Sequence, residues 1–241
     1  RHHFGAPSDD QILHPGHDLG CGYAHGGDAA AAEAIQRHAA SFGVVACIQR
    51  RHAAHVAALL ALAACQDAPP EQPPLAGAAI GAEFTLTGED GDPVSWSDFD
   101  GQYRTLYFGY TYCPDVCPVD TQRAMAGLKA FEQANPELGA QIQPLFVSVD
   151  PARDTPAVLA EFTDSFHPRL IGMTGTKEQI DAVTEAFAAV YSIEEPNEAG
   201  GYLVGHTNIT YLFGPDGEPL AMLPTDQGPE AVAAELDKWV R

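Results

Sequence analysis

Apolar runs alternate with helix-spaced apolar positions over the second part of the chain. Continuous apolar runs at 105–110 and 142–149 indicate strands that are buried on both faces. Short alternating runs predict further strands at 84–87, 94–96, 170–173, 202–205, 209–213 and 220–223. Apolar residues three and four positions apart predict helices at 120–134, 177–190 and 229–240. A further helix is predicted to begin at Pro156, with Thr155 as its N-terminal cap. The pattern predicts an α/β fold, a central mixed β-sheet flanked by helices, with an N-terminal β-hairpin extension at 84–96.

An unbroken run of small apolar residues lies much earlier, at 56–64, and follows Arg50 and Arg51. Its length and its basic flank are typical of a signal-peptide core. The run is too short to cross a membrane as a folded helix. The run ends in the sequence L-A-A-C, which resembles a bacterial lipobox whose cysteine becomes lipidated. We therefore predict a lipoprotein signal peptide at 49–65, with Cys65 as the lipidated residue.

The segments on either side of this signal need separate interpretations. Residues 1–48 lack hydrophobic periodicity, so we expect a mis-assigned N-terminal extension or a disordered segment. A histidine-rich metal-storage tail is the alternative, although these histidines lack ligand spacing. Residues 66–79 begin with a Pro-rich stretch and predict an extended tether between the anchor and one domain at 80–241.

The charge balance excludes one class of partner. The 241 residues carry a formal net charge of −21 at pH 7. Such a surface repels phosphate backbones and anionic lipid headgroups, so we expect no nucleic acid partner. Otherwise the acidity indicates a solvated surface.

Two cysteines are the strongest chemical signal. The sequence C-P-D-V-C-P places Cys113 and Cys117 where the strand at 105–110 is followed by a helix. Residues at i and i+4 share a helix face, so the two sulfurs can close a disulfide or bind one metal ion. The exposed N–H groups of a helix N-terminus favour thiolate, so we expect a reactive dithiol. The position of this dithiol, between the first central strand and the helix that follows it, resembles that in proteins with the thioredoxin-like fold.

Three patterns occur together in one order: C-P-D-V-C-P at 113–118, D-P-A-R-D-T-P at 150–156, and H-T-x-x-x-Y-L-x-x-P-x-G at 206–217. Together they resemble the Sco/SenC family of copper proteins, over about residues 80–241. The resemblance implies that Cys113, Cys117 and His206 bind copper. Two thiolates and an imidazole suit Cu(I), and can hold Cu(II) if another ligand joins.

The resemblance also implies a cellular role. Members of this family are thioredoxin-like domains tethered to the outer face of an energy-transducing membrane. They are implicated in delivering copper to the binuclear copper site of cytochrome c oxidase subunit II. For this chain we therefore expect a bacterial cell-envelope protein, anchored by lipid on the periplasmic face of the cytoplasmic membrane. Its partners would be that subunit or a similar copper enzyme, and a periplasmic thiol reductant or another copper carrier.

Several other residues have weaker interpretations. Many relatives carry Asp immediately before the histidine, whereas this chain has Gly205. The absence of that carboxylate puts the copper affinity and the Cu(II) geometry of this site in doubt. Asp115, Asp150 and Asp154 resemble family residues and either tune the copper or dock a partner, or serve only caps and turns. Arg153 belongs to the same family loop. We also predict that the three methionines lie in the core and do not bind copper: Met125, Met173 and Met222.

A second function remains open. The same cysteines, Cys113 and Cys117, could act as a thiol–disulfide oxidoreductase that reduces the cysteines of subunit II before metal insertion. The C-x-x-x-C spacing and the remote His206 favour metal over the C-x-x-C chemistry of dedicated oxidoreductases. A peroxide-reducing enzyme lacks a matching cysteine loop, and a scaffold with a stapling disulfide is the remaining alternative.

Overall fold

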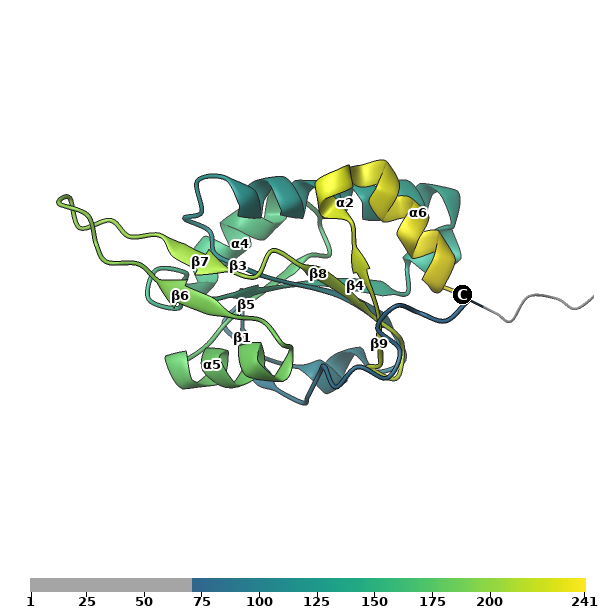
Figure 1. Ribbon diagram of the computed structural model, residues 1–241, viewed down its shortest axis with the longest axis horizontal. Coiled ribbons are helices and arrows are strands. Elements are labelled where there is room, and N and C mark those ends of the chain that lie inside the picture. The colour runs from purple at the N-terminus through teal and green to yellow at the C-terminus, as the bar shows by residue number, and fades with distance from the viewer. Residues whose placement is uncertain (1–70) are drawn as a thin grey trace, which may run out of the picture. The chain divides into compact units, whose positions relative to one another are not determined.

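The computed structural model of the chain describes residues 71–241 (Figure 1). The predicted extension at 1–48, the signal peptide at 49–65 with Cys65, and the start of the tether lie outside the described residues. Between residues 71 and 241, no helix has both the length and the apolar composition needed to cross a membrane. The amide of Leu75 donates to the carbonyl of Leu220 at 3.0 Å, so packed structure already begins within the predicted tether.

A mixed sheet forms the centre of the described part. Seven strands lie in the order β2-β1-β5-β4-β3-β8-β9 within residues 71–241. Parallel pairing joins β3 to β4 and β4 to β5, and the other neighbours are antiparallel. The strands are β1 (Thr85–Gly88), β2 (Pro93–Ser95), β3 (Tyr103–Gly109), β4 (Ile142–Ser148), β5 (Ile171–Thr174), β8 (Thr210–Phe213) and β9 (Pro219–Leu223). This arrangement confirms the predicted thioredoxin-like sheet, which the β1–β2 hairpin extends.

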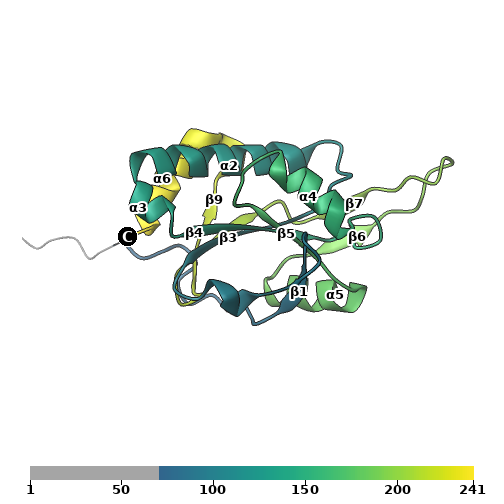
Figure 2. The same cartoon turned by 180° about the vertical axis from the view of Figure 1, so that it is seen from behind.

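Helices cover both faces of this sheet (Figures 1 and 2). One face carries α2 (Val116–Ala134), α3 (Pro136–Gly139), α4 (Pro156–Asp164) and α6 (Pro229–Trp239). The other carries α5 (Lys177–Ala186) and the 3₁₀ turn η1 (Trp96–Phe99), and a second turn, η2 (Thr225–Gln227), precedes α6. Because both faces are covered, β3 is buried along its whole length, as its apolar run predicts.

Close packing holds α2 against α6. A Cβ atom added to Gly127 of α2 would lie 2.6 Å from the Cβ atom of Val232 in α6. Real Cβ atoms do not approach that closely, so this position needs glycine for the two helices to touch. On the opposite face of the sheet, the ring of Trp96 packs edge-on against Phe187 and Phe213 at centroid distances of 5.1 Å.

Two short strands form a separate sheet. They are β6 (Tyr191–Ile193) and β7 (Val204–His206), which pair antiparallel with each other. We call residues 190–207 the arm, because both views show the loop between β6 and β7 extending away from the main sheet (Figures 1 and 2). The sequence predicted a strand at 202–205 but not its partner β6.

Two predicted boundaries were wrong for identifiable reasons. Helix α2 begins at Val116 rather than Asp120, because Pro118 lies in the first turn, where its missing N–H is tolerated. Helix α5 ends at Ala186 rather than residue 190. Ala188 adopts a left-handed backbone with φ of 53°, which ends the helix and directs the chain into β6.

Candidate metal centre

The two cysteines lie at the carboxyl end of β3. Cys113 is in the loop after the strand, and Cys117 is the second residue of α2. The backbone N–H of Cys117 donates to Sγ of Cys113 at 3.3 Å, and both thiols are free. Cys113 is 9% exposed and Cys117 is completely buried. The loop therefore presents two adjacent cysteines, of which only Cys113 keeps any exposed surface.

The structure brings His206 to these sulfurs from the end of β7. Its Nε2 atom lies 2.9 Å from Sγ of Cys117, and its Nδ1 atom lies 3.1 Å from the carbonyl oxygen of Thr207. A carbonyl oxygen only accepts, so Nδ1 carries the proton and Nε2 directs its lone pair toward the sulfur. One ligand atom from each of Cys113, Cys117 and His206 lies within 4.8 Å of the other two. Such a group could hold one metal ion.

Two tyrosine rings lie beside the imidazole. The rings of Tyr107 and Tyr110 stand edge-on to His206, at centroid distances of 6.0 and 5.8 Å. The hydroxyl of Tyr110 accepts a hydrogen bond from the amide of Val204 at 3.3 Å, two residues before the histidine. The sequence analysis missed both tyrosines, since nothing in the Y-F-G-Y stretch distinguishes site residues from core residues.

Burial disfavours the charged forms of two of these side chains, Cys117 and His206. It raises the pKa of the Cys117 thiol, and the hydrogen bond between the side chains of Cys117 and Cys113 adds to this effect. The helix N-terminus was expected to favour a thiolate, but the pKa of Cys117 is raised instead, and burial is the largest cause. Burial also lowers the pKa of His206, which favours the neutral imidazole that a metal needs.

A carboxylate on α2 stands behind the site. Asp120 accepts a hydrogen bond from the Tyr107 hydroxyl at 3.5 Å, and its charge favours a protonated His206. Gly205, the departure from the family pattern noted in the sequence, is exposed, and a Cβ atom on it would lie 3.1 Å from the hydroxyl of Ser192. The nearby negative charge is therefore supplied from the helix, a contact that the sequence order does not reveal.

The other predicted residues fall into two groups. Asp115 is exposed at the start of α2 and makes no capping hydrogen bond with its side chain. Asp150 and Asp154 are completely buried, so neither presents a surface to a partner. Asp154 accepts hydrogen bonds from the backbone N–H and the hydroxyl of Thr111, at 3.0 and 2.6 Å. Of the predicted tuning residues, the two buried ones contact segments that carry the site.

The predicted core methionines are not all in the core. Met125 and Met173 are buried, as expected. The prediction for Met222 was wrong, because 48% of this residue is exposed on β9. It lines an open groove of about 520 Å³ together with Val116 and Asp120 of α2. The pattern around residue 222 indicates a strand but cannot tell which face is covered.

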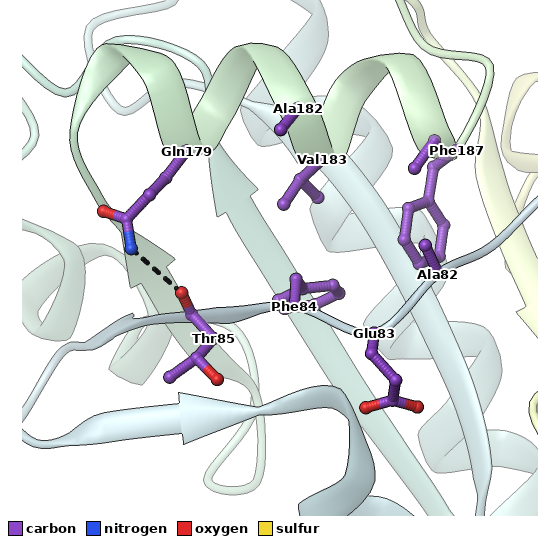
Figure 3. A pocket seen from close by; sticks show the side chains of 9 residues that line it. Ala82, Glu83, Phe84, Thr85, Gln179, Ala182, Val183 and Phe187 are labelled. Atoms are coloured by element: carbon purple, nitrogen blue, oxygen red, sulfur yellow. Dashed lines mark hydrogen bonds between the residues drawn. The ribbon is translucent and has the colours of Figure 1, made fainter.

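A separate cavity of about 340 Å³ lies between α5 and the chain leading into β1 (Figure 3). Its walls include Phe84, Val183 and Phe187, and Gln179 donates to the carbonyl of Thr85 at 3.1 Å across its end. None of the predicted site residues lines this cavity. It belongs to the packing of α5 rather than to the metal centre.

Known proteins share this domain. The family model SCO1/SenC matches residues 72–241. Protein SenC of Rhodobacter capsulatus is 46% identical over 158 residues, which cover 66% of this chain and 69% of that protein. The mitochondrial SCO1 homolog of Homo sapiens is 37% identical over 164 residues, 67% of this chain but only 53% of that protein. The chain thus spans about half the length of the mitochondrial relative.

Solved structures confirm the thioredoxin-like architecture. The structure of Bradyrhizobium japonicum ScoI with copper bound matches with a TM-score of 0.60 and 33% identity, over 67% of this chain and 99% of that one. Arabidopsis thaliana ScoI, also with copper bound, matches with a TM-score of 0.62 and 32% identity, over 66% and 97%. The matched region covers nearly all of each of these two solved chains.

Proposed function

Because this chain belongs to the SCO1/SenC family, we propose that it is a copper-binding metallochaperone whose ligands are Cys113, Cys117 and His206. The observation that supports this most directly is the meeting of two sulfurs and one imidazole nitrogen within 4.8 Å. Similar domains from B. japonicum and A. thaliana have copper bound in their solved structures.

The donor set accounts for the choice of metal. Soft thiolates together with an imidazole favour Cu(I), which accepts three ligands, and Cu(II) needs one further donor. The neutral imidazole of His206 is ready to bind, whereas the Cys117 thiol must first lose its proton. Cys113 is the more accessible sulfur, so it is the ligand that a partner site can reach first. Copper can then leave by stepwise ligand exchange.

The proposed client is the binuclear copper site of cytochrome c oxidase subunit II, or a similar copper enzyme. The family resemblance supports this client. The alternative, reduction of that subunit's cysteines, uses the same two thiols. Cys117 is completely buried and its pKa is raised, so Cys113 would have to be the attacking sulfur of such an enzyme. A pure reductase, however, has no need of His206. We therefore place metal delivery first.

The proposal also gives a location. Arg50, Arg51 and the apolar run ending in L-A-A-C support lipidation of Cys65 on the outer face of the cytoplasmic membrane of a bacterium. Mass spectrometry of the mature N-terminus tests this point. A diacylglyceryl group on Cys65 is expected, and Cys65→Ser should release the chain from membranes. Membrane retention of the Cys65→Ser chain would contradict the anchor.

The function is tested by titrating the reduced full chain with Cu(I) against a coloured Cu(I) chelator. One tightly held copper is expected, and Cys113→Ser should lose it. Upstream cysteines and histidines are the same in both proteins, so only residues in the domain account for a difference. His167→Gln is a matched control, since His167 pairs with Glu132 on α2 rather than with the cysteines. Equal affinity in wild type and Cys113→Ser would refute the copper site.

Delivery needs a second measurement. The copper-loaded chain is mixed with the soluble domain of oxidase subunit II, and copper is followed in each separated protein. Movement of copper from the loaded chain to the subunit supports the chaperone function. If no copper moves, and the metal-free, reduced chain only reduces a disulfide of the subunit, the reductase function replaces the chaperone function.

A further inference from the structure

The position of His206 depends on contacts outside the main sheet. The histidine is the last residue of β7, which pairs only with β6 in the described part of the chain. The base of the arm is closed by the amide of Thr207, which donates to the carbonyl of Val190 at 3.0 Å. The cysteines, by contrast, are carried by β3 and α2. Contacts between the arm and the segment that carries the cysteines must therefore set the distance from His206 to the two sulfurs.

One loop contacts the arm just before His206. The guanidinium carbon of Arg153 lies 3.6 Å from the ring centroid of Tyr202, and Nη1 donates to the Tyr202 carbonyl at 3.0 Å. The hydroxyl of Tyr202 donates to Oδ1 of Asp150 at 2.8 Å. Nε of Arg153 donates to the other oxygen of Asp150. The backbone, ring and hydroxyl of Tyr202, four residues before His206, are all held by this pair.

The same loop contacts the cysteine segment. Asp154 accepts two hydrogen bonds from Thr111, which lies two residues before Cys113, and a third from the hydroxyl of Ser148 at 2.6 Å. The Arg153 guanidinium also faces the rings of Tyr110 and Tyr112, at 5.6 and 5.0 Å from their centroids. A single stretch of chain thus binds both segments that bring ligands to the metal centre.

We propose that Asp150, Arg153 and Asp154 form a clamp that sets the separation of His206 from the two cysteines, with Arg153 as the positioning residue. This inference rests on the proposed function, because the atoms it positions are the proposed copper ligands. A planar guanidinium can stack on a ring and donate in its own plane at the same time, whereas an ammonium group cannot. The arginine side chain is only 22% exposed, so these contacts are shielded from water.

The clamp predicts a specific defect. Without the guanidinium, Tyr202 loses its stacking partner and a carbonyl contact, and the arm moves more freely. Copper is then held mainly by the two sulfurs, because His206 spends less time in reach. Loss of groups that orient metal ligands typically weakens metal binding by about 10- to 100-fold. We expect Arg153→Met to weaken Cu(I) binding within this range.

A purely structural role is the competing explanation, and a double-mutant cycle separates the two. Cu(I) affinity is measured for the reduced full chain, Arg153→Met, His206→Ala and the double variant. If Arg153 acts through His206, adding Arg153→Met to His206→Ala should change affinity by less than about twofold. An equal loss in both backgrounds would overturn the clamp.

Amide hydrogen exchange of the metal-free full chain provides a readout that does not involve copper. We expect Arg153→Met to speed exchange at Val204, whose N–H donates to Tyr110, and to leave β3 and β4 unchanged. Arg169→Met is the matched control. Its guanidinium also pairs with a carboxylate, Glu132, but contacts the Ile142 carbonyl at the start of β4, the opposite end of the strand from the clamp. Unchanged exchange at Val204 in Arg153→Met would contradict the clamp.

Arg153→Lys covers the case in which the methionine variant fails to fold. Lysine keeps the charge beside Asp150 but loses the planar stack, so faster arm exchange and weaker copper binding are still expected. Wild-type values in Arg153→Lys would show that charge alone suffices and would overturn the geometric argument. If the wild-type chain itself holds no copper, the proposed function fails, and the exchange data still decide whether the clamp holds the arm.

Discussion

The Nε2 atom of His206 lies 2.9 Å from the Sγ atom of Cys117, although 89 residues separate the two in the chain. The cysteine comes from the first turn of α2 and the histidine from a two-stranded arm. Because each belongs to a different element, removing one leaves the other in place. Their roles can therefore be separated by single substitutions.

Replacing His206 should affect copper and redox chemistry differently. We expect His206→Ala to weaken Cu(I) binding by at least about tenfold, as loss of one of three ligands requires. Cys113 and Cys117 keep their contact and should still form and lose a disulfide with added oxidant and reductant. The measurements are Cu(I) competition and thiol counting. Wild-type copper affinity in this variant would remove His206 from the ligand set.

Copper binding should release protons. Burial raises the pKa of Cys117, so this thiol is protonated in the metal-free protein at neutral pH and must ionise to bind copper. Affinity should therefore rise with pH, with at least one proton released for each copper bound. Calorimetric titration in buffers of different ionisation enthalpy counts the protons. A count of zero would mean that the thiol is already ionised.

Acid should destabilise the metal-free fold through His206. Its folded pKa lies below the ordinary value of 6.5, so the unfolded chain takes up a proton first as the pH falls. The contribution to stability is therefore present above pH 6.5 and is lost as the pH falls toward the folded pKa. Urea unfolding of wild type and His206→Gln, from about pH 8 to about pH 5, measures this difference. Parallel pH curves for the two proteins would contradict it.

Placing a carboxylate at position 205 should change copper affinity little. Successive side chains of a strand point to opposite faces, so a residue at 205 points away from the face of His206. We expect Gly205→Asp to shift Cu(I) affinity by less than about threefold, below the tenfold effects typical of groups that orient metal ligands. Cu(I) competition checks this. A gain of tenfold or more would show that Gly205 weakens the site.

The contact between α2 and α6 should tolerate no added methyl group. Gly127→Ala places a Cβ atom 2.6 Å from Val232, and overpacking of this kind costs about 1–3 kcal/mol. This loss exceeds the gain of about 1 kcal/mol that alanine brings to a helix. Gly201→Ala is the control, since its added Cβ would meet no atom closer than 3.4 Å. Denaturant unfolding compares the two, and equal stability would contradict the packing argument.

Local patterns in the sequence determined most of the fold and the chemistry of the site. The strands at β3 and β4 and the Thr155–Pro156 start of α4 follow from apolar runs and capping residues, which act over a few positions. The three motifs in one order identified the family and proposed the ligands. They could do so because each motif lies within one short segment.

Tertiary structure alone decided how these pieces act together. The pKa of Cys117 depends on burial by distant elements, and it reversed an expectation drawn from the helix N-terminus alone. The pairing of β6 with β7, and the contacts of Arg153 with Tyr202, join residues far apart in the chain. Periodicity along the sequence carries no information on such contacts, because they depend on how separate elements pack.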